Sequence, residues 1–434
     1  MEKYSSYKDS GVHWLGEIPS HWSLRKMKYT FVERSQKGFP KEPLLAATQS
    51  YGVIKKEDYE VRTVEALKNL ETLKLVEIGD FVISLRSFQG GIEYSHCRGI
   101  ISPAYTILTP THITTDYFKF LGKSSIFINL LKSTVTGIRE GQNIDYNKLK
   151  SEYMPIPPIA EQQSMATYLD KATAEIDKAI VQQQRMIDLL NERKQIIIQR
   201  AVTKGLDENV EMKNSGLNWL GQIPSHWELV RLGYSSRIRA RLGWRGLKAN
   251  EYVDSGYVFL SAFNIVNNKM QWDNVNFINK FRYDESPEIK LKIGDILLVK
   301  DGAGIGKCAR VDKLPLGEAT ANGSLAFITP KPDLDYRYLH YFLICDSFKK
   351  YTELLLTGMG VPHFTQGAMK KVKIPIPPIN EQKRIVFHLD KEVGEFDLAI
   401  GRLEKQISFL QERKQIIISE VVTGKIKVLK FPTP

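Results

Sequence analysis

Residues 155–162 read Pro-Ile-Pro-Pro-Ile-Ala-Glu-Gln, and the segment that follows them up to Thr203 contains neither glycine nor proline. The same block returns at residues 375–382 as Pro-Ile-Pro-Pro-Ile-Asn-Glu-Gln, and this second copy runs to Thr423. The copies align without a gap at an offset of 220 residues, the separation of Pro155 from Pro375. Self-similarity of this length indicates an internal duplication.

Apolar residues follow a heptad pattern in both copies, which predicts a coiled-coil seam of about forty residues, or about 60 Å of helix. The predicted seam residues are Leu169, Ile176, Ile180, Ile187, Leu190 and Ile197 in the first copy and Leu389, Phe396, Ile400, Leu403, Ile407, Leu410 and Ile417 in the second. Because the two seams match, we expect the helices to pair with each other in an antiparallel arrangement. The alternative is two amphipathic helices packed on separate domains.

A second duplicated block opens each half of the chain. Residues 10–22 read Ser-Gly-Val-His-Trp-Leu-Gly-Glu-Ile-Pro-Ser-His-Trp, and residues 215–227 read Ser-Gly-Leu-Asn-Trp-Leu-Gly-Gln-Ile-Pro-Ser-His-Trp. Apolar neighbours favour buried anchoring roles for the tryptophans over base-stacking roles, and structural roles for the adjacent histidines. The tryptophans are Trp14, Trp22, Trp219 and Trp227.

The regions between these blocks, about 23–150 and 228–370, contain short β-like runs broken by Gly, Asn and Asp, together with short helical patterns. We therefore predict an α+β fold: two globular α+β domains joined by two long antiparallel coiled-coil helices, with a pseudo-twofold internal repeat. The predicted boundaries are 1–155, 156–205, 206–375 and 376–434. The Ile-Gly-Asp sequences ending at Asp80 and Asp295 are matching landmarks in the two domains.

Length, composition and charge limit the classes of protein to which this chain can belong. The chain has 434 residues, 42% of them hydrophobic, and a formal charge of +12, which favours a polyanionic partner such as DNA or RNA. No apolar run is long enough for a membrane span, and the polar N-terminus does not resemble a signal peptide. Cys97, Cys308 and Cys345 stand alone, so we expect a cytoplasmic protein with reduced thiols and no metal site.

Sequence motifs for catalysis fail on inspection. The segment from Asp301 to Lys307 resembles a phosphate-binding loop, yet it lacks the required first Gly and the Ser or Thr after Lys. No Asn/Asp-Pro-Pro-aromatic methyltransferase loop, nucleophilic triad or His/Cys metal cluster stands out. We therefore expect a non-catalytic chain without cofactors.

Basic and amide side chains in loops predict a DNA-binding function, because Arg and Lys contact phosphate and Arg or Gln read base edges. Several of these residues recur at corresponding places in the two halves. The predicted DNA-binding residues are Arg86, Ser87, Gln89, Arg139, Gln142, Asn143, Arg237, Arg239, Arg241, Trp244, Arg245, Lys300, Lys307, His363, Thr365 and Gln366. The alternative for each is an ordinary solvated surface or turn.

The order of these blocks, taken twice, resembles the specificity subunit of type I restriction-modification systems. The resemblance implies two target recognition domains on double-stranded DNA, each reading half of a bipartite site with a fixed gap. It also implies docking of two methyltransferase subunits and of restriction subunits, which would carry S-adenosylmethionine, ATP and Mg. The main rival hypothesis is a coiled-coil protein–protein adaptor without sequence-specific DNA binding. A second rival is a nuclease or methyltransferase in its own right.

Overall fold

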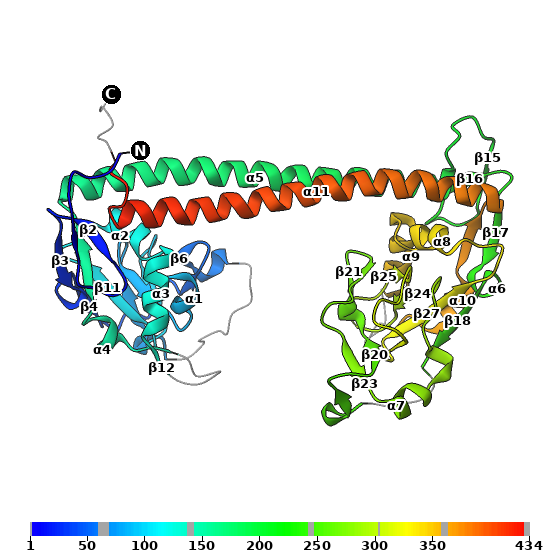
Figure 1. Cartoon of the computed structure of the whole chain (residues 1–434), viewed down its shortest axis with the longest axis horizontal. Coiled ribbons are helices and arrows are strands. Elements are labelled where there is room, and N and C mark those ends of the chain that lie inside the picture. Colours follow the sequence, from blue (N-terminus) through cyan, green and yellow to red (C-terminus); the bar gives the residue numbers. More distant parts are fainter. Residues whose placement is uncertain are drawn as a thin grey trace. The chain divides into compact units, whose positions relative to one another are not determined.

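The computed structural model describes residues 2–59, 69–136, 143–241, 247–302, 304–356 and 363–428. The chain folds into two compact units: unit 1 comprises residues 1–184 and 404–434, and unit 2 comprises residues 185–403. Helices α5 (Ile159–Lys204) and α11 (Ile379–Val422) each begin in one unit and end in the other (Figure 1). The predicted α+β class with two long helices is confirmed. Among the described residues, none of the helices has the length and apolarity that crossing a bilayer requires.

The two long helices run antiparallel within each unit. In unit 1 the Lys414 Nζ atom of α11 lies 2.6 Å from the Asp177 carboxylate of α5. In unit 2 the Lys194 Nζ atom of α5 lies 2.9 Å from the Asp397 carboxylate of α11. The two ion pairs are equivalent under the 220-residue repeat. Both lysines lie in the heptad rows, so the pairs fix the helix register.

The predicted seam lies on the inner face of this helix pair. All of its residues are buried or half-buried, and Leu169 and Leu389 are fully buried. By contrast, Leu189 and Phe409 on the outer face are exposed. Burial of these apolar rows between the two helices stabilises their pairing.

Each unit contains a four-stranded antiparallel sheet with the same strand order. In unit 1 the order is β4 (Phe31–Arg34), β11 (Thr106–Pro110), β8 (Phe81–Ile83) and β9 (Glu93–Tyr94). In unit 2 it is β18 (Ser236–Ala240), β27 (Leu325–Pro330), β24 (Ile296–Val299) and β25 (Cys308–Arg310). The duplication therefore extends through the domains, although their sequences have diverged.

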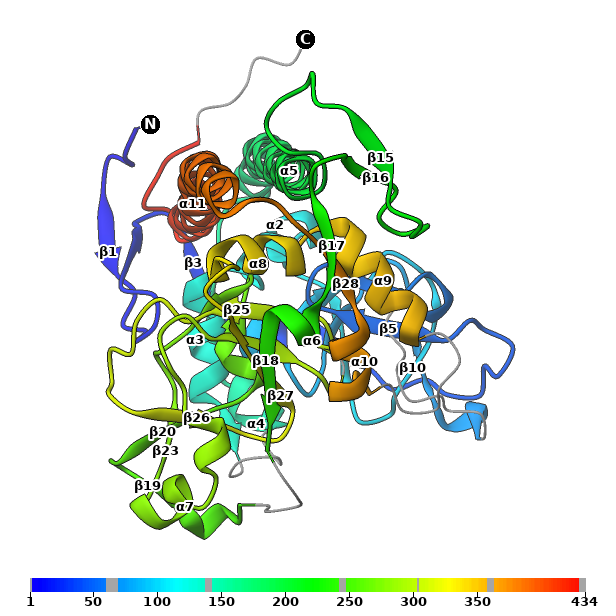
Figure 2. The ribbon, with the colours of Figure 1, turned by 90° about the vertical axis from the view of Figure 1, so that its right-hand side faces the viewer.

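Helices cover each sheet on the side of the long helices. They are α2 (Thr115–Leu121) and α3 (Ser125–Ser133) in unit 1, and α8 (Tyr336–Leu343) and α9 (Asp346–Leu356) in unit 2. Figure 2 shows α8 and α9 between the long helices and the sheet of unit 2. One short ladder connects each domain to its long helix: β3 (Ser23–Lys26) with β14 (Tyr153–Ile156) in unit 1, and β17 (Glu228–Arg231) with β28 (Lys373–Ile376) in unit 2.

The remaining strands differ between the units. Unit 1 has the ladders β5 (Leu45–Thr48) with β6 (Gly52–Lys55), and β7 (Lys74–Val76) with β10 (Gly99–Ile101). Unit 2 has a second sheet ordered β19 (Tyr252–Val253), β23 (Asn276–Ile278), β20 (Tyr257–Leu260) and β26 (Ala319–Ala321). Isolated parallel bridging of Leu44 to Ile100 in unit 1 corresponds to the parallel pairing of β20 with β26 in unit 2. The loops that follow β5 and β20 are therefore equivalent in position.

Buried tryptophans anchor the start of each domain to a long helix, as predicted. Trp22 and Trp227 are at most 1% exposed. Their indole Nε1 atoms donate hydrogen bonds to Glu161 (3.0 Å) and Glu381 (3.1 Å), the glutamates that follow the two proline blocks. Repeat-equivalent histidines contact the same carboxylates from the solvent side. The base-stacking alternative for these tryptophans is therefore excluded by their burial.

The glutamine after each glutamate holds the loop that precedes the domain helices. Gln162 accepts a hydrogen bond from the Thr114 amide (2.8 Å), and Gln382 accepts one from the Asp335 amide (2.8 Å). Each glutamine also donates to the carbonyl of a proline in its own proline block. The Pro-Pro-Ile-x-Glu-Gln sequence is thus a joint between domain and helix.

A buried ion pair lies at the equivalent place in each sheet. In unit 1 Asp80 accepts hydrogen bonds from the Arg34 guanidinium (2.7 Å) and the Thr109 hydroxyl (2.7 Å). In unit 2 Asp295 accepts two hydrogen bonds from Arg239 (2.7 and 2.8 Å) and one from the Thr329 hydroxyl. The Ile-Gly-Asp landmarks therefore mark a structural triad that joins three strands.

Candidate nucleic-acid interface

Three loops of unit 2 meet where β20, β26 and β24 end. Backbone hydrogen bonds join them: the Asn322 amide donates to the Leu260 carbonyl (2.9 Å), and the Lys300 amide donates to the Ser324 carbonyl (2.8 Å). The Phe364 amide donates to the Lys300 carbonyl (2.9 Å), which brings in the segment before helix α10 (Gln366–Lys371). We call this group the loop cluster of unit 2: residues 261–264, 300–302, 304–307, 322–324 and 363–365.

An ion-pair network lies within this cluster. Asp301 pairs with Lys300, and its carboxylate lies 2.6 Å from the Nδ1 atom of His363. Burial alone would raise the pKa of Asp301, but hydrogen bonds from Lys300 and His363 lower it below its ordinary value. The structure therefore brings together two segments that were predicted separately from the sequence. Lys307 is exposed at the same cluster.

Unit 1 has a polar pocket at the corresponding place. It has a volume of about 390 Å³, and its lining includes Gln49, Tyr51, Arg86 and Gln89. These residues come from the turn between β5 and β6 and from the loop after β8, which holds the one-turn helix α1 (Ser87–Gly90). We call it the polar pocket of unit 1. Amide and guanidinium groups at its rim are the side-chain types that read base edges.

A buried carboxylate also lines this pocket. Glu93 is 2% exposed, and the Lys123 Nζ atom lies 2.6 and 2.7 Å from its two oxygens. Burial raises the pKa of Glu93, while pairing with Lys123 opposes that rise. Gly90 packs directly on the Gln49 side chain: a Cβ at this position would lie 2.8 Å from it. The pocket wall is therefore closely packed around Gln49.

The other predicted DNA-binding residues fall at varied places. Arg237, Asn143 and Thr365 are exposed, and Gln366 is half-buried in α10. The Thr365 side chain caps α10 by accepting a hydrogen bond from the Ala368 amide (3.1 Å). Ser87 is buried, and its hydroxyl accepts a hydrogen bond from the Ser84 amide (2.9 Å). Four predictions lie outside the described residues: Arg139, Gln142, Trp244 and Arg245.

Two arginines that were predicted to contact DNA belong to the fold instead. The Arg239 side chain is 10% exposed and is held by the buried Asp295. The Arg241 side chain is 7% exposed and forms an ion pair with Glu285 at 3.5 Å. A guanidinium held inside the protein is not available to phosphate, so both predictions are corrected. Arg239 is the unit 2 counterpart of Arg34.

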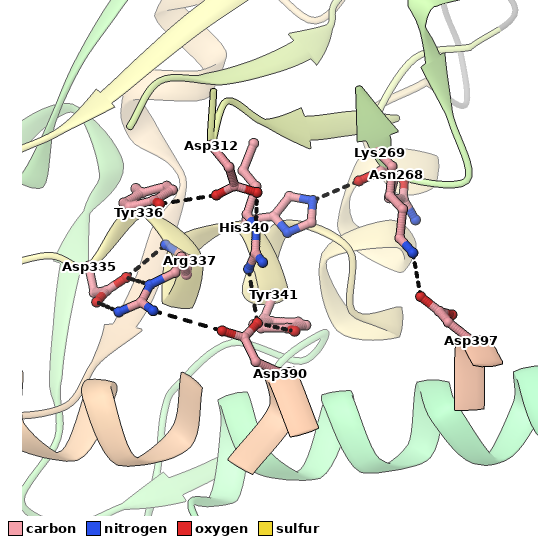
Figure 3. Close-up of polar contacts among 11 residues, drawn as sticks. Asn268, Lys269, Asp312, Asp335, Tyr336, Arg337, His340, Tyr341, Asp390 and Asp397 are labelled. Carbon is pink, nitrogen blue, oxygen red and sulfur yellow. Dashed lines mark hydrogen bonds and ion pairs between the residues drawn. The ribbon is translucent and has the colours of Figure 1, made fainter. Parts of the chain in front are cut away.

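The domain of unit 2 contacts α11 through a polar network (Figure 3). Asp390 accepts hydrogen bonds from the Tyr341 hydroxyl (2.7 Å) and the Arg310 guanidinium (3.2 Å). Further along α11, Asp397 accepts a hydrogen bond from Lys269 (2.5 Å). In unit 1 the equivalent of Asp390 is Asp170, which pairs with Lys119 at 3.0 Å. Equivalent aspartates thus hold each domain, and with it the loops, against its long helix.

A buried histidine lies beside this network. The Nε2 atom of His340 in α8 lies 3.1 Å from the Asn268 carbonyl, at the turn between β21 (Ile265–Val266) and β22 (Lys269–Met270). Asn267 and Asn268 both have positive φ, as a two-residue hairpin turn requires. Burial, with Arg310 nearby, lowers the pKa of His340 to about 4.

This depressed pKa predicts acid sensitivity of unit 2. The unfolded chain takes up the proton near pH 6.5 and the folded chain only near pH 4, so stability is lost as the pH falls through that window. Between pH 7 and pH 5 we expect the free energy of unfolding of unit 2 to fall by about 2 kcal/mol. His340→Gln, which keeps a donor for Asn268, should remove this loss. Hydrogen exchange of α8 at pH 7 and at pH 5, in wild type and in H340Q, measures this loss of stability. The control His112→Gln, at an exposed position, should leave the loss unchanged, and equal losses in wild type and H340Q would contradict the assignment.

Comparisons with known proteins agree with this architecture. Residues 224–407 match the family model described as the type I restriction modification DNA specificity domain. The type I restriction enzyme MjaVIII specificity subunit of Methanocaldococcus jannaschii is 27% identical over 359 residues, 82% of this chain and 80% of that protein. The putative type I restriction enzyme MjaX specificity subunit of the same organism is 24% identical over 446 residues, 95% of this chain and 96% of that protein.

A solved structure shares the fold. It comes from a study of complex assembly and conformational transition of the type I restriction-modification system. It superposes with a TM-score of 0.65 at 17% sequence identity, covering 94% of this chain and 99% of that chain. At 17% sequence identity, this similarity shows a shared fold.

Proposed function

Because this chain belongs to the family of type I restriction-modification specificity subunits, we propose that each of its units reads one half of a two-part DNA sequence. The recognition domains are residues 1–155 and 206–375, and the helical segments are residues 156–205 and 376–434. The coiled-coil adaptor hypothesis receives no support from the comparisons.

One observation carries the proposal: the scaffold is the same in both units, and the loops on it differ. The sheet order, the Trp–Glu anchors and the buried Asp–Arg–Thr triads all occur twice. The polar pocket of unit 1 and the loop cluster of unit 2 stand at corresponding strand ends but present different side chains. A shared scaffold with different loops is the structure expected of two domains that bind DNA in the same way but recognise different sequences.

Repeat-equivalent apolar residues on the outer helix faces suggest where partner subunits dock. In unit 2, Leu189 and Ile196 of α5 are 52% and 48% exposed. In unit 1, their equivalents Phe409 and Ile416 of α11 are 56% and 48% exposed. A duplicated apolar patch fits two copies of one partner. We assign it to two methyltransferase subunits, with restriction subunits completing the complex.

The chemistry in this proposal belongs to those partners. S-adenosylmethionine would bind the methyltransferase subunits, and ATP and Mg would bind the restriction subunits. Among the described residues, no group of three or more His, Cys, Asp or Glu side chains is arranged to hold a metal ion. The role of this chain is to bind DNA and to place the partners on it.

A genome-wide map of adenine methylation in host cells, with and without this gene, tests the function. We expect a two-part motif with a gap of fixed length to lose methylation on deletion and to regain it on complementation. Co-expression of this chain with its methyltransferase subunits in a methylation-free host repeats the test without other methylation from the original host. Methylation that is unchanged in both settings would refute the proposal.

A further inference from the structure

Each unit displays one bare aromatic ring on the loop after the same strand. Phe263, which follows β20 in unit 2, is 92% exposed. Tyr51, which follows β5 in unit 1, is 65% exposed. The two loops are equivalent, because β5 and β20 hold the same place in the two units. The next buried apolar residue after each ring, Val53 or Ile265, stands two positions further on.

Both rings stand on turns that side-chain hydrogen bonds hold in place. In unit 2 the Asn264 side chain, 7% exposed, accepts a hydrogen bond from the Ser261 amide (2.9 Å), and the Asn264 amide donates to the Ser261 carbonyl (3.0 Å). In unit 1 the Thr48 hydroxyl accepts a hydrogen bond from the Tyr51 amide (3.0 Å) and donates to the Gly52 carbonyl (3.0 Å). The rings are therefore presented by ordered backbone.

The surroundings of both rings are polar and include cationic groups. Tyr51 lines the polar pocket of unit 1 together with Arg86 and Gln89. Phe263 belongs to the loop cluster of unit 2, in which Lys300 is paired with Asp301 and Lys307 is exposed. Amide and cationic neighbours suit DNA, whose phosphates and base edges they contact, better than an apolar protein surface.

We propose that Phe263 and Tyr51 each enter the base stack at one step of the half-site that their own unit reads, and stack on the opened base faces. The proposal rests on the proposed function and adds a second means of recognition to it. A base face accepts either a phenyl or a phenol ring, so the hydroxyl that distinguishes Tyr51 from Phe263 is compatible with the same role. Ring insertion costs base unstacking, and pyrimidine–purine steps unstack most easily. Each half-site should therefore prefer such a step where no base edge is read.

The test uses the complex of this chain with its methyltransferase subunits, and duplexes that carry the two-part motif found by methylation mapping. In each duplex, 2-aminopurine replaces one adenine in or directly beside the unit 2 half-site, other than the methylated adenine. Wild-type complex should raise the fluorescence at one step, and Phe263→Ala should abolish that rise. Because aromatic stacking contributes about 1–3 kcal/mol per base, the same variant should bind its duplex about 5-fold to 150-fold more weakly.

Phe281→Ala is the matched control, since Phe281 is 74% exposed in the same unit on α7 (Lys280–Asp284), beyond the opposite end of β20. It should match wild type in fluorescence and affinity. In unit 1, Tyr51→Ala should act on the other half-site, with the 58% exposed Tyr29 as its control in Tyr29→Ala. Hydrogen exchange of the sheets verifies that each variant is folded.

The outcomes separate this inference from the proposed function. If wild type methylates and binds a two-part motif but F263A equals F281A in affinity and fluorescence, ring insertion is overturned and the function stands. If F263A weakens assembly with the methyltransferase subunits and leaves DNA affinity unchanged, the ring is a protein contact and the inference is again overturned. If wild type shows no motif, the proposed function itself fails.

Discussion

Asp295→Ala should destabilise unit 2 by about 3–5 kcal/mol, because it leaves the Arg239 guanidinium buried without its counter-ion. Asp295 is fully buried and accepts hydrogen bonds from Arg239, from Thr329 and from the Lys292 amide (2.9 Å). All of these donors would lose their acceptor at once. The measurement is hydrogen exchange of β24 and β27 by mass spectrometry, because local exchange reports the opening of one unit.

The duplication supplies a matched control for this prediction. Asp80→Ala in unit 1 removes the equivalent carboxylate, but the Arg34 side chain is 21% exposed, against 10% for Arg239. Water can therefore solvate Arg34 in part, and we expect a smaller loss. Replacing both charges of unit 2 with apolar side chains, as in Arg239→Met with Asp295→Leu, should recover part of the stability. A D295A chain with wild-type protection in β24 and β27 would contradict this account.

Replacing the domain of unit 2 with that of unit 1 should give a chain that reads the same half-site twice. The graft would put residues 27–151 in place of residues 232–371, between strands that are equivalent in the two units. We expect this result because the loops that read DNA are part of the transferred domain, and the scaffold that receives the domain is duplicated.

The docking contacts support such a graft. In unit 1 the Tyr117 hydroxyl donates to the Val422 carbonyl (2.7 Å), and in unit 2 the Tyr338 hydroxyl lies 3.3 Å from the Val202 carbonyl. Val202 and Val422 are equivalent under the 220-residue repeat. Asp170 and Asp390, which also hold the domains, are equivalent in the same way. The unit 1 domain should therefore find its own contact points on the segment of α5 and α11 in unit 2.

The sequence predicted the parts of the fold that repeat. Gapless similarity over the proline blocks predicted α5 and α11, and the apolar neighbours of Trp22 and Trp227 predicted their burial. These features are local, so periodicity and neighbouring residues carry them. The shared strand order of the two sheets was not predicted, because strand pairing depends on contacts far apart in the sequence.

The candidate site was only partly predictable for the same reason. Arg239 lies in a cation-rich stretch, and only the placement of Asp295 on a neighbouring strand shows that it serves the fold. Phe263 and Tyr51 were missed as site residues. Each is an aromatic residue in the loop three residues after the end of a short strand, which is the signal that the sequence offered. Exposure separates these rings from the buried aromatics, and exposure is a property of the packed structure.

The most direct test of the central claim is the methylation map of a methylation-free host that expresses the methyltransferase subunits with the grafted chain. If each unit reads its own half-site, the motif should carry the unit 1 half-site at both ends, and the unit 2 half-site should disappear. A motif that keeps the unit 2 half-site, while the grafted chain is folded and active, would contradict the claim that reading resides in the two domains.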